Sequence, residues 1–301
     1  MIPILFAMPG NEAFALHLDR AMSCEVGRLE VRRFPDGESH VRLLSPVRER
    51  DVVFVCTLDR PDEKIMQLYF AVSIARQLGA RRVGLVAPYL SYMRQDAQFR
   101  EGEGITSDYF ARFLSDFCDW LVTVDPHLHR HHRLNEIYSI PTKVVQAAPA
   151  IARWVDENVD NPVIIGPDAE SEQWAGKVAQ AIECPHVILQ KVRSGDREVA
   201  VSALDASTCE GRTPVIVDDI ASTGKTMIAA AERLRAASLP RPVCVAIHPV
   251  FCDGAHEELS ACAERIVSCN TIVHPSNAID IAEAVAVAAV ELMAVLPVGD
   301  L

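Results

Sequence analysis

The segment Val215–Thr226, with the sequence VIVDDIASTGKT, constrains the fold of this 301-residue chain more than any other segment. Its first three residues are β-branched, which favours a buried strand, and the alanine-rich stretch that starts at Met227 is typical of a helix. The order is therefore strand, acidic pair, turn of small residues, helix. In an open α/β sheet this order places the turn at the carboxyl edge of the strands, where ligands bind.

The turn that follows Asp218 and Asp219 has the chemistry of a phosphate site with a sugar or a cation beside it. Backbone N–H groups in such a turn, in front of a helix, bind phosphate. The two carboxylates would repel that anion, so they fit acceptors for sugar hydroxyls or ligands of a cation. An ordinary buried strand with an acidic end is the alternative. A P-loop is excluded, because it requires a glycine five residues before Gly224-Lys225, where this chain has Asp219.

Bulk composition indicates the general class of protein. The length suggests roughly two domains, and a hydrophobic content of 50% allows a large core. The chain has 29 Lys and Arg against 41 Asp and Glu, for a net charge of −12, which argues against a nucleic-acid partner. The nine cysteines are scattered without a C-x-x-C pair, so we expect reduced thiols in a cytoplasmic protein.

The apolar segment 281–296 is the one candidate for a membrane span. It contains Glu283 and Glu291 and is shorter than the ~20 residues that a spanning helix needs. We therefore expect a packed helix and no membrane partner.

Strands and helices alternate along the chain, which predicts parallel βαβ units. Acidic loops follow strands in both halves, at Asp125 in the first and at Asp168 and Asp218 in the second. This repetition predicts two similar α/β domains that face one cleft. The predicted strands are 2–7, 51–57, 82–88, 120–124, 162–166, 186–189, 215–217 and 242–247, and the predicted helices include 12–21, 64–78, 108–117 and 174–182.

Four further stretches each have a functional and a plain interpretation. Residues 34–38, FPDGE, are either a hairpin turn or a grip for a purine, and the loop 89–106 is either solvated or a nucleotide clamp with Arg94 and Gln95. The histidine run 127–132 lacks zinc-finger spacing and is interrupted by Arg130, so only His127, beside Asp125, stands out. The basic segment 190–197 is either a surface loop or a mobile loop that closes over polyphosphate.

Taken in order along the chain, these stretches resemble the ribose-phosphate diphosphokinases, also called phosphoribosyl pyrophosphate synthetases, and the archaeal-type branch in particular. The resemblance covers nearly the whole chain. It rests on FPDGE 34–38, PYLSYMRQD 88–96, FREGEGIT 99–106, Asp125-Pro126-His127, Pro167-Asp168, Lys191-Val192-Arg193, VIVDDIASTGKT 215–226 and His248-Pro249-Val250.

The resemblance implies two similar type I phosphoribosyltransferase-like domains, each a mainly parallel sheet flanked by helices. Residues 1–145 are expected to form the N-terminal domain, with the C-terminal helix of about 285–301 packing back on it. Residues 146–284 are expected to form the C-terminal domain, which carries the ribose-phosphate loop.

The resemblance also implies a reaction, in which ATP transfers its diphosphoryl group to ribose 5-phosphate with the help of Mg²⁺, in a homodimer or larger assembly. It assigns ATP binding to Phe34, Asp36, Gly37, Glu38, Arg94, Gln95 and Asp96. It assigns ribose 5-phosphate binding to Asp218, Asp219, Ser222, Thr223, Gly224, Lys225 and Thr226. It assigns catalysis to Lys191 and Arg193, and metal binding to His127 and Asp168.

Two positions depart from the pattern of that family. Lys225 stands where the family has a second glycine, and Glu170 lies in Ala169-Glu170-Ser171, which replaces a glycine-rich continuation. These departures keep open a catalytically weak or silent regulatory subunit as an alternative. A phosphoribosyltransferase is the other alternative, although it leaves FPDGE and the RQD loop unexplained.

Overall fold

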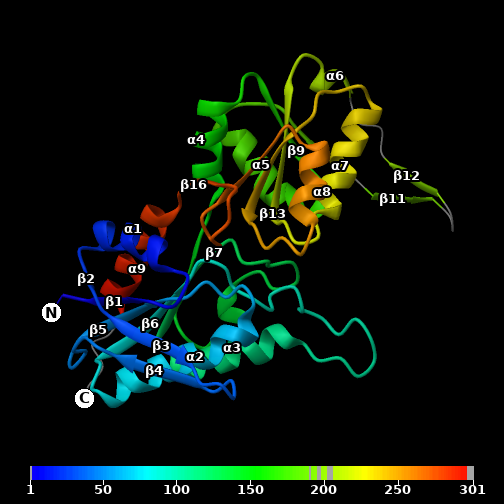
Figure 1. Cartoon of the computed structure of the whole chain (residues 1–301). Coiled ribbons are helices and arrows are strands. Elements are labelled where there is room, and N and C mark those ends of the chain that lie inside the picture. The colour runs from blue at the N-terminus through cyan, green and yellow to red at the C-terminus, as the bar shows by residue number, and fades with distance from the viewer. Residues whose placement is uncertain (1, 190, 195–197, 202–205, 297–301) are drawn as a thin grey trace. The chain divides into compact units, whose positions relative to one another are not determined.

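In the computed structural model the chain divides into two compact units, Met1–Val145 with Ala282–Leu301 and Gln146–Ile281 (Figure 1). The structure describes residues 2–189, 191–194, 198–201 and 206–296, with backbone alone for 191–194, 198–201 and 206–207. Each unit is a parallel sheet with helices on both faces, so the α/β fold class predicted from the sequence is confirmed.

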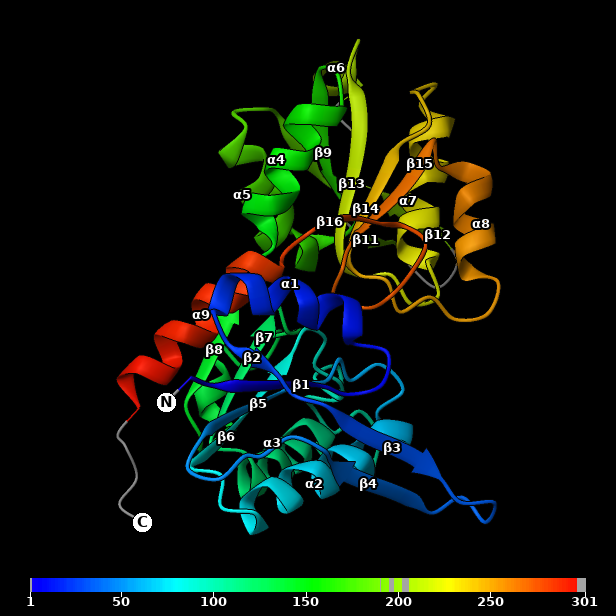
Figure 2. The same cartoon turned by 60° about the vertical axis from the view of Figure 1, so that its left-hand side comes forward.

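The N-terminal unit is built on a parallel sheet with the strand order β2-β1-β5-β6-β7-β8. Helices α1 and α9 contact each other on one face, and α2 and α3 contact each other on the opposite face (Figure 2). The central strands are continuous apolar runs because both of their faces are covered; all five residues of β5 are buried. The strands are β1 (Ile4–Ala7), β2 (Glu25–Val26), β5 (Asp51–Val55), β6 (Arg82–Ala87), β7 (Trp120–Val124) and β8 (Thr142–Val145), and the helices are α1 (Glu12–Met22), α2 (Pro61–Gln77), α3 (Thr106–Phe117), α9 (Ala282–Val295) and the short 3-10 helix η1 (Leu134–Glu136).

An antiparallel hairpin, β3 (Leu29–Arg33) with β4 (Ser39–Leu43), stands apart from this sheet. It packs on α2 through β4, and Arg33 Nη2 donates a hydrogen bond to the backbone oxygen of Glu63 at 2.8 Å. The FPDGE turn is therefore the tip of a hairpin that contacts α2 through β4 and through Arg33, the residue directly before the turn.

The C-terminal unit has the strand order β10-β9-β13-β14-β15-β16, again all parallel. Helices α4 and α5 contact each other on one face of the sheet, and α7 and α8 contact each other on the other face (Figure 1). The strands are β9 (Pro162–Gly166), β10 (His186–Ile188), β13 (Thr213–Ile220), β14 (Val243–His248), β15 (Arg265–Cys269) and β16 (Asn277–Ile279), and the helices are α4 (Ala148–Asn158), η2 (Ala169–Ser171), α5 (Glu172–Ala181), α6 (Ala206–Cys209), α7 (Lys225–Ala236) and α8 (Ala255–Cys262).

A second hairpin, β11 (Lys191–Ser194) with β12 (Glu198–Val201), follows β10. The two units therefore repeat one plan: a first strand, an outer neighbour, a hairpin, and then a strand on the other side of the first. In each unit the direction of the connections reverses at one point, between β1 and β5 and between β9 and β13. Ligands bind at such switch points, outside the carboxyl ends of the strands.

Two local features differ from the sequence-based expectations. Strand β13 continues through Asp218 and Asp219 to Ile220 instead of ending at Val217. Part of the predicted loop 190–197 is the strand β11. The division between the two units, between Val145 and Gln146, lies at the expected domain boundary, after the end of edge strand β8 and before the start of α4.

Helix α9 is a packed helix, as expected for the apolar segment near the C-terminus. It contacts α1, β7 and β8, and Arg82 Nη1 donates to the backbone oxygen of Leu296 just beyond its end, at 3.0 Å. Among the described residues, no helix combines the length and the apolar character needed to cross a bilayer.

Candidate active site

The turn between β13 and α7 presents unpaired backbone amides at the switch point of the C-terminal unit. Helix α7 begins at Lys225 without a side-chain cap. In the described part of the chain, the N–H groups of residues 222–226 have no hydrogen-bond acceptor. The first N–H groups of a helix lack partners within it and bind anions, so this turn is built to receive a phosphate group.

Gly224 is the residue that lets the turn enter the helix. Its φ of +67° lies in the left-handed region, which glycine adopts without steric cost. Lys225, the residue at which the sequence departs from the family pattern, is the first residue of α7, and its side chain is exposed. A cation at a helix N-terminus is unfavourable on its own and becomes favourable once an anion binds there, so Lys225 does not obstruct a phosphate site.

The acidic pair lies at the end of β13, directly before this turn. Asp218 and Asp219 are 9% and 7% exposed, and each accepts a hydrogen bond from the next backbone N–H, at 3.1 Å and 2.8 Å. Burial, followed by the charges of Asp219 and Asp168, raises the pKa of Asp218 well above its ordinary value. The site therefore brings three carboxylates close together, which suits hydroxyl donors or a cation.

A neighbouring loop braces the turn from the side of β14. Phe251 N donates to Ala221 O at 2.8 Å, and Cys252 N donates to Ser222 O at 2.9 Å. The preceding residue of the sheet, His248, is buried and its Nδ1 lies 3.0 Å from Thr271 Oγ1. The conformation of residues 221–224 is thus fixed by the protein, which leaves their amides oriented before a ligand arrives.

Asp168 lies on the other side of the switch point, after β9. It caps η2 by accepting hydrogen bonds from Glu170 N at 3.1 Å and Ser171 N at 3.2 Å, while Ser171 Oγ donates to Asp168 O at 2.6 Å. These contacts fix the carboxylate near Asp218. Glu170, the second departure from the family pattern, has an exposed side chain.

The residues assigned to ATP in the FPDGE turn lie at the tip of the β3–β4 hairpin. Phe34 is 38% exposed, with the guanidinium of Arg32 4.6 Å from its ring centroid. Gly37 has a φ of +94°, which a turn of this shape requires, and Asp36 Oδ1 accepts from Glu38 N at 3.2 Å. An exposed ring beside two acids can stack on a purine and accept from its amino group.

The loop with Arg94, Gln95 and Asp96 is organised by a residue that sequence reasoning missed. Asp96 is 6% exposed and forms an ion pair with Arg130, whose Nη1 lies 2.6 Å from Asp96 Oδ1. Arg94 and Gln95 are exposed beside this pair. Asp96 therefore holds the loop on the segment after β7, and its neighbours present the polar groups. In the sequence, Arg130 is only an interruption of the histidine run.

His127 belongs to the N-terminal unit and Asp168 to the C-terminal unit, so a metal ion shared by both stays a prediction. The rings of His127 and His129 have their centroids 6.3 Å apart, and His131 lies 3.4 Å from Asp108. Within the described residues, no set of three or more His, Cys, Asp or Glu side chains is arranged to hold a metal ion.

The carboxylates at the C-terminal switch point nevertheless suit Mg²⁺. This ion is commonly bound through one or two carboxylates, with substrate phosphates and waters as its other ligands. Burial and then the charges of Asp219 and Asp168 raise the pKa of Asp218, and a cation bound there would favour the ionised carboxylate. An imidazole such as His127 suits softer ions better.

The two residues assigned to catalysis, Lys191 and Arg193, lie on β11, which pairs with β12. Their side chains lie outside the described part of the structure, so their roles stay predictions.

Comparison with known proteins identifies the family. Residues 3–117 match the model of the N-terminal domain of ribose phosphate pyrophosphokinase, and residues 134–281 match the phosphoribosyl transferase domain. The ribose-phosphate pyrophosphokinase of Methanopyrus kandleri is 32% identical, over 94% of this chain and 97% of its own. That of Saccharolobus solfataricus is also 32% identical, over 85% of this chain and 88% of its own. The chain belongs to the ribose-phosphate pyrophosphokinase family, and the resemblance inferred from its motifs is confirmed.

A solved structure supports the fold independently. The crystal structure of phosphoribosylpyrophosphate synthetase from Mycobacterium smegmatis matches with a TM-score of 0.83 over 97% of this chain and 99% of its own, at 24% sequence identity. At that identity the match concerns the fold. Its coverage shows that the likeness in fold extends over nearly the whole length of both chains.

Proposed function

We propose that this chain is an active ribose-phosphate diphosphokinase, which converts ATP and ribose 5-phosphate into phosphoribosyl pyrophosphate and AMP. The observation that carries the proposal is the pair of buried carboxylates, Asp218 and Asp219, followed directly by a turn of unpaired amides at residues 222–226. This arrangement offers acceptors for ribose hydroxyls and donors for a 5-phosphate in a single chain segment.

In the proposed reaction the 1-hydroxyl oxygen of ribose 5-phosphate attacks the β-phosphorus of ATP. A new bond forms between this oxygen and the β-phosphorus, the bond from the β-phosphorus to the oxygen that bridges it to the α-phosphorus breaks, and AMP leaves with that oxygen. The hydroxyl proton is released. Most of the catalysis in such a transfer is positioning and neutralisation of charge.

The residues divide this work by unit. Asp218 and Asp219 would orient the ribose, and the amides of residues 222–226 with Lys225 would hold its phosphate. Phe34, Asp36, Glu38, Arg94 and Gln95 would bind ATP, and Lys191 and Arg193 would offset charge on the transferred group. When bound at Asp168, with His127 as a second candidate ligand, Mg²⁺ would supply further charge neutralisation on the phosphates. Self-association into dimers or larger assemblies stays a prediction.

The test is the release of AMP from Mg-ATP and ribose 5-phosphate by the purified chain. We expect Lys191→Ala to lower this rate by roughly a thousandfold or more, as for other cations aimed at a transferred phosphoryl group. Lys177→Ala, on the exposed face of α5, is the matched control and should leave the rate unchanged. A full rate in Lys191→Ala would remove that lysine from its role.

Two other outcomes would contradict the proposal as a whole. The absence of turnover with ribose 5-phosphate and every other pentose phosphate would favour a regulatory subunit. Consumption of phosphoribosyl pyrophosphate together with a nucleobase would favour a phosphoribosyltransferase, which the match of residues 3–117 to the kinase-specific N-terminal domain speaks against.

A further inference from the structure

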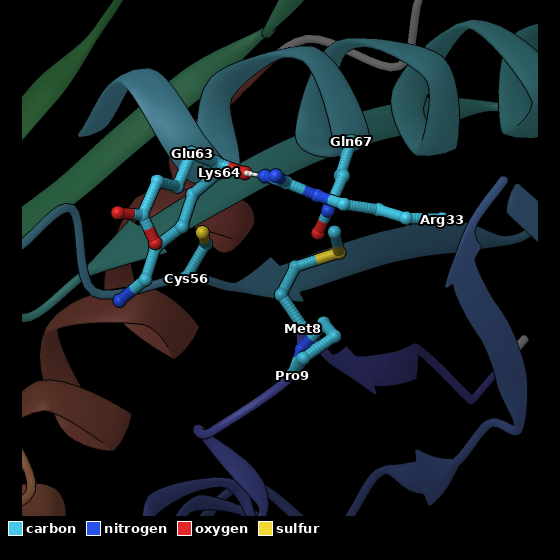
Figure 3. A pocket seen from close by; sticks show the side chains of 7 residues that line it. All are labelled: Met8, Pro9, Arg33, Cys56, Glu63, Lys64 and Gln67. Carbon is cyan, nitrogen blue, oxygen red and sulfur yellow. Dashed lines mark hydrogen bonds between the residues drawn. The ribbon is translucent and has the colours of Figure 1, made fainter. Parts of the chain in front are cut away.

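The N-terminal unit has a cavity of its own at the position that corresponds to the phosphate site of the C-terminal unit. It has a volume of about 240 Å³ and is lined by Met8, Pro9, Arg33, Cys56, Glu63, Lys64 and Gln67 (Figure 3). Met8 and Pro9 follow β1, and Cys56 follows β5. The cavity therefore lies outside the carboxyl ends of the two strands between which the connections reverse, which is where an α/β sheet binds ligands.

The floor of this cavity is fixed by hydrogen bonds. Asn11 is 2% exposed, and its side-chain amide donates to Met8 O at 3.2 Å and to Pro9 O at 3.3 Å. Its side-chain oxygen accepts from Thr57 N at 2.8 Å. One buried side chain thus ties the segment after β1 to the segment after β5. The cavity is preformed, as binding sites for small molecules usually are.

Lys64 stabilises the segment after β5, and its ammonium group is already paired within the protein. Its Nζ donates to Thr57 O at 3.1 Å and forms an ion pair with Asp59. The ammonium is therefore neutralised locally, and the chemistry of the cavity depends on the other three polar side chains.

Those three side chains keep hydrogen-bonding capacity. Arg33 donates one hydrogen bond, to Glu63 O at 2.8 Å, and has no acidic partner among the described residues. Since a guanidinium has five N–H donors, most remain available. In the same described residues, the carboxylate of Glu63 and the amide of Gln67 make no hydrogen bond. Figure 3 shows Arg33 and Gln67 at one side of the cavity and the Glu63 carboxylate at the other, with Cys56 between them.

This distribution selects a class of ligand. A guanidinium beside an amide binds a phosphate group well, because its planar fork matches the phosphate oxygens. A carboxylate some distance away accepts hydrogen bonds from hydroxyl groups, and the apolar side chains of Met8 and Pro9 can cover the carbon face of a sugar. The cavity is smaller than the 300–1,000 Å³ typical of drug-sized ligands.

We propose that this cavity binds a small sugar phosphate, with its phosphate on Arg33 and Gln67 and its hydroxyls on Glu63, as a second site in addition to the phosphate turn of the C-terminal unit. Arg33 is the last residue of β3 and immediately precedes Phe34. Occupancy would therefore hold the turn end of the hairpin against α2.

The test uses calorimetric titration of the full chain with glucose 6-phosphate, a sugar phosphate that the proposed reaction does not consume. We expect one equivalent to bind. Arg33→Leu should weaken this binding by roughly tenfold or more, since it removes a charge-assisted contact, and Gln67→Ala should weaken it several-fold. The matched controls are Arg42→Leu on the same hairpin and Gln77→Ala on the same helix, both exposed and outside the cavity.

Release of AMP from ATP and ribose 5-phosphate should be unchanged in Gln67→Ala, so that the result is independent of the proposed activity. Three outcomes would overturn the proposal: no binding of glucose 6-phosphate, equal affinity in wild type and both cavity variants, or equally tight binding of inorganic phosphate, which would show that the sugar is not recognised. If Arg33→Leu fails to fold, the affinity of Gln67→Ala for glucose 6-phosphate, compared with that of Gln77→Ala, decides the test.

Discussion

The two units share a strand order but place different charged groups at their switch points. In the C-terminal unit the strand beyond the reversal, β13, ends in two buried acids followed by unpaired amides. In the N-terminal unit the corresponding strand, β5, is followed by the buried and uncharged Cys56, and the charge comes from Arg33 on a hairpin. The repeated fold fixes where a ligand can bind, and the residues after each strand decide what binds there.

The hairpins of the two units can be compared in the same way. Each unit inserts one between the outer strand and the strand beyond the reversal, β3–β4 in the first and β11–β12 in the second. The first carries Phe34 at its tip, and the second carries Lys191 and Arg193. The candidates for ATP binding and for catalysis thus lie on equivalent insertions, which can evolve without disturbing the sheet that each unit needs for its core.

Among substitutions of side chains that the structure describes, exchange of Asp219 for asparagine should have the largest effect. If it had no effect, the contrast between the two switch points would not hold. Asp219→Asn keeps the shape of the side chain and an oxygen for Ile220 N, but it loses the charge that would orient the ribose. We expect kcat/KM for ribose 5-phosphate to fall by roughly 100- to 1,000-fold, the usual loss for one charged contact at the reacting group. Initial rates of AMP release measure it.

The matched control is Asp253→Asn, an exposed acid in the loop before α8 of the same unit. Its activity should equal that of the wild type. Equal activity in Asp219→Asn and Asp253→Asn would show that the acidic end of β13 is structural.

The contrast between the units also shows what the sequence can and cannot predict. Strands such as β5, β6 and β9 are predictable because a parallel strand covered on both faces is one continuous apolar run. The edge strand β8 is short and only partly buried, so its pattern is weak. Pro149 suggests a break in the sequence, whereas proline is favoured in the first turn of a helix, and α4 begins one residue before it.

In the candidate site, too, local features can be predicted from the sequence and tertiary contacts cannot. The order of strand, acids, turn and helix at 215–226 is local, so the chemistry of that turn can be predicted from one segment. The ion pair of Asp96 with Arg130 joins residues 34 positions apart, and the cavity at Arg33 requires β1, β5, α2 and the hairpin to come together. Such contacts depend on tertiary packing and leave no local pattern.

The N-terminal unit contains a buried acid, Asp51, whose charge is compensated. Asp51 is 6% exposed and accepts hydrogen bonds from Arg81 Nε at 3.0 Å and Arg82 Nε at 2.9 Å. Burial alone would raise the pKa of Asp51, but the hydrogen bonds from Arg82 and Arg81 outweigh it and lower the pKa to about 2. The contribution of this carboxylate to stability is therefore present above about pH 4 and lost as the pH falls towards 2.

Asp51→Asn should lower the free energy of unfolding by about 2 kcal/mol at pH 7, and the difference from wild type should shrink as the pH falls below 4. Urea denaturation across this range measures both effects. Glu25→Gln is the control, because Glu25 pairs with Arg50 at the surface and such pairs contribute little. An equal loss in both variants would contradict a special role for Asp51.

Asp218 should respond in the opposite direction, because it is buried close to two other carboxylates, those of Asp219 and Asp168. Its pKa is raised in the folded state, so its contribution to stability is present below the unfolded pKa of about 3.9 and lost as the pH rises through the folded value. Asp218→Asn should therefore stabilise the chain at pH 7 while impairing catalysis. Melting curves at pH 4 and pH 7 measure this, and a destabilised variant at pH 7 would show that the carboxylate is compensated.

The smallest expected effects come from the two turn glycines, one in each unit. Gly224 and Gly37 have φ values of +67° and +94°, and an added Cβ would come no closer than 3.5 Å to its neighbours at Gly224 and would meet nothing within 4 Å at Gly37. Alanine should therefore cost only backbone strain, about 1 kcal/mol of stability at each position. The two variants should differ in the substrate whose KM they raise. Gly224→Ala should raise KM for ribose 5-phosphate and Gly37→Ala should raise KM for ATP, each by up to about tenfold.

Gly176→Ala is the control for these two substitutions, and its expected effect on stability has the opposite sign. Gly176 lies inside α5, where alanine is the better helix former by up to about 1 kcal/mol and its Cβ would meet the end of the flexible Glu172 side chain at 3.3 Å. It should therefore raise stability slightly and change neither KM. If Gly224→Ala and Gly37→Ala changed the same KM, the assignment of one substrate to each unit would fail, because the two turns would then serve one ligand.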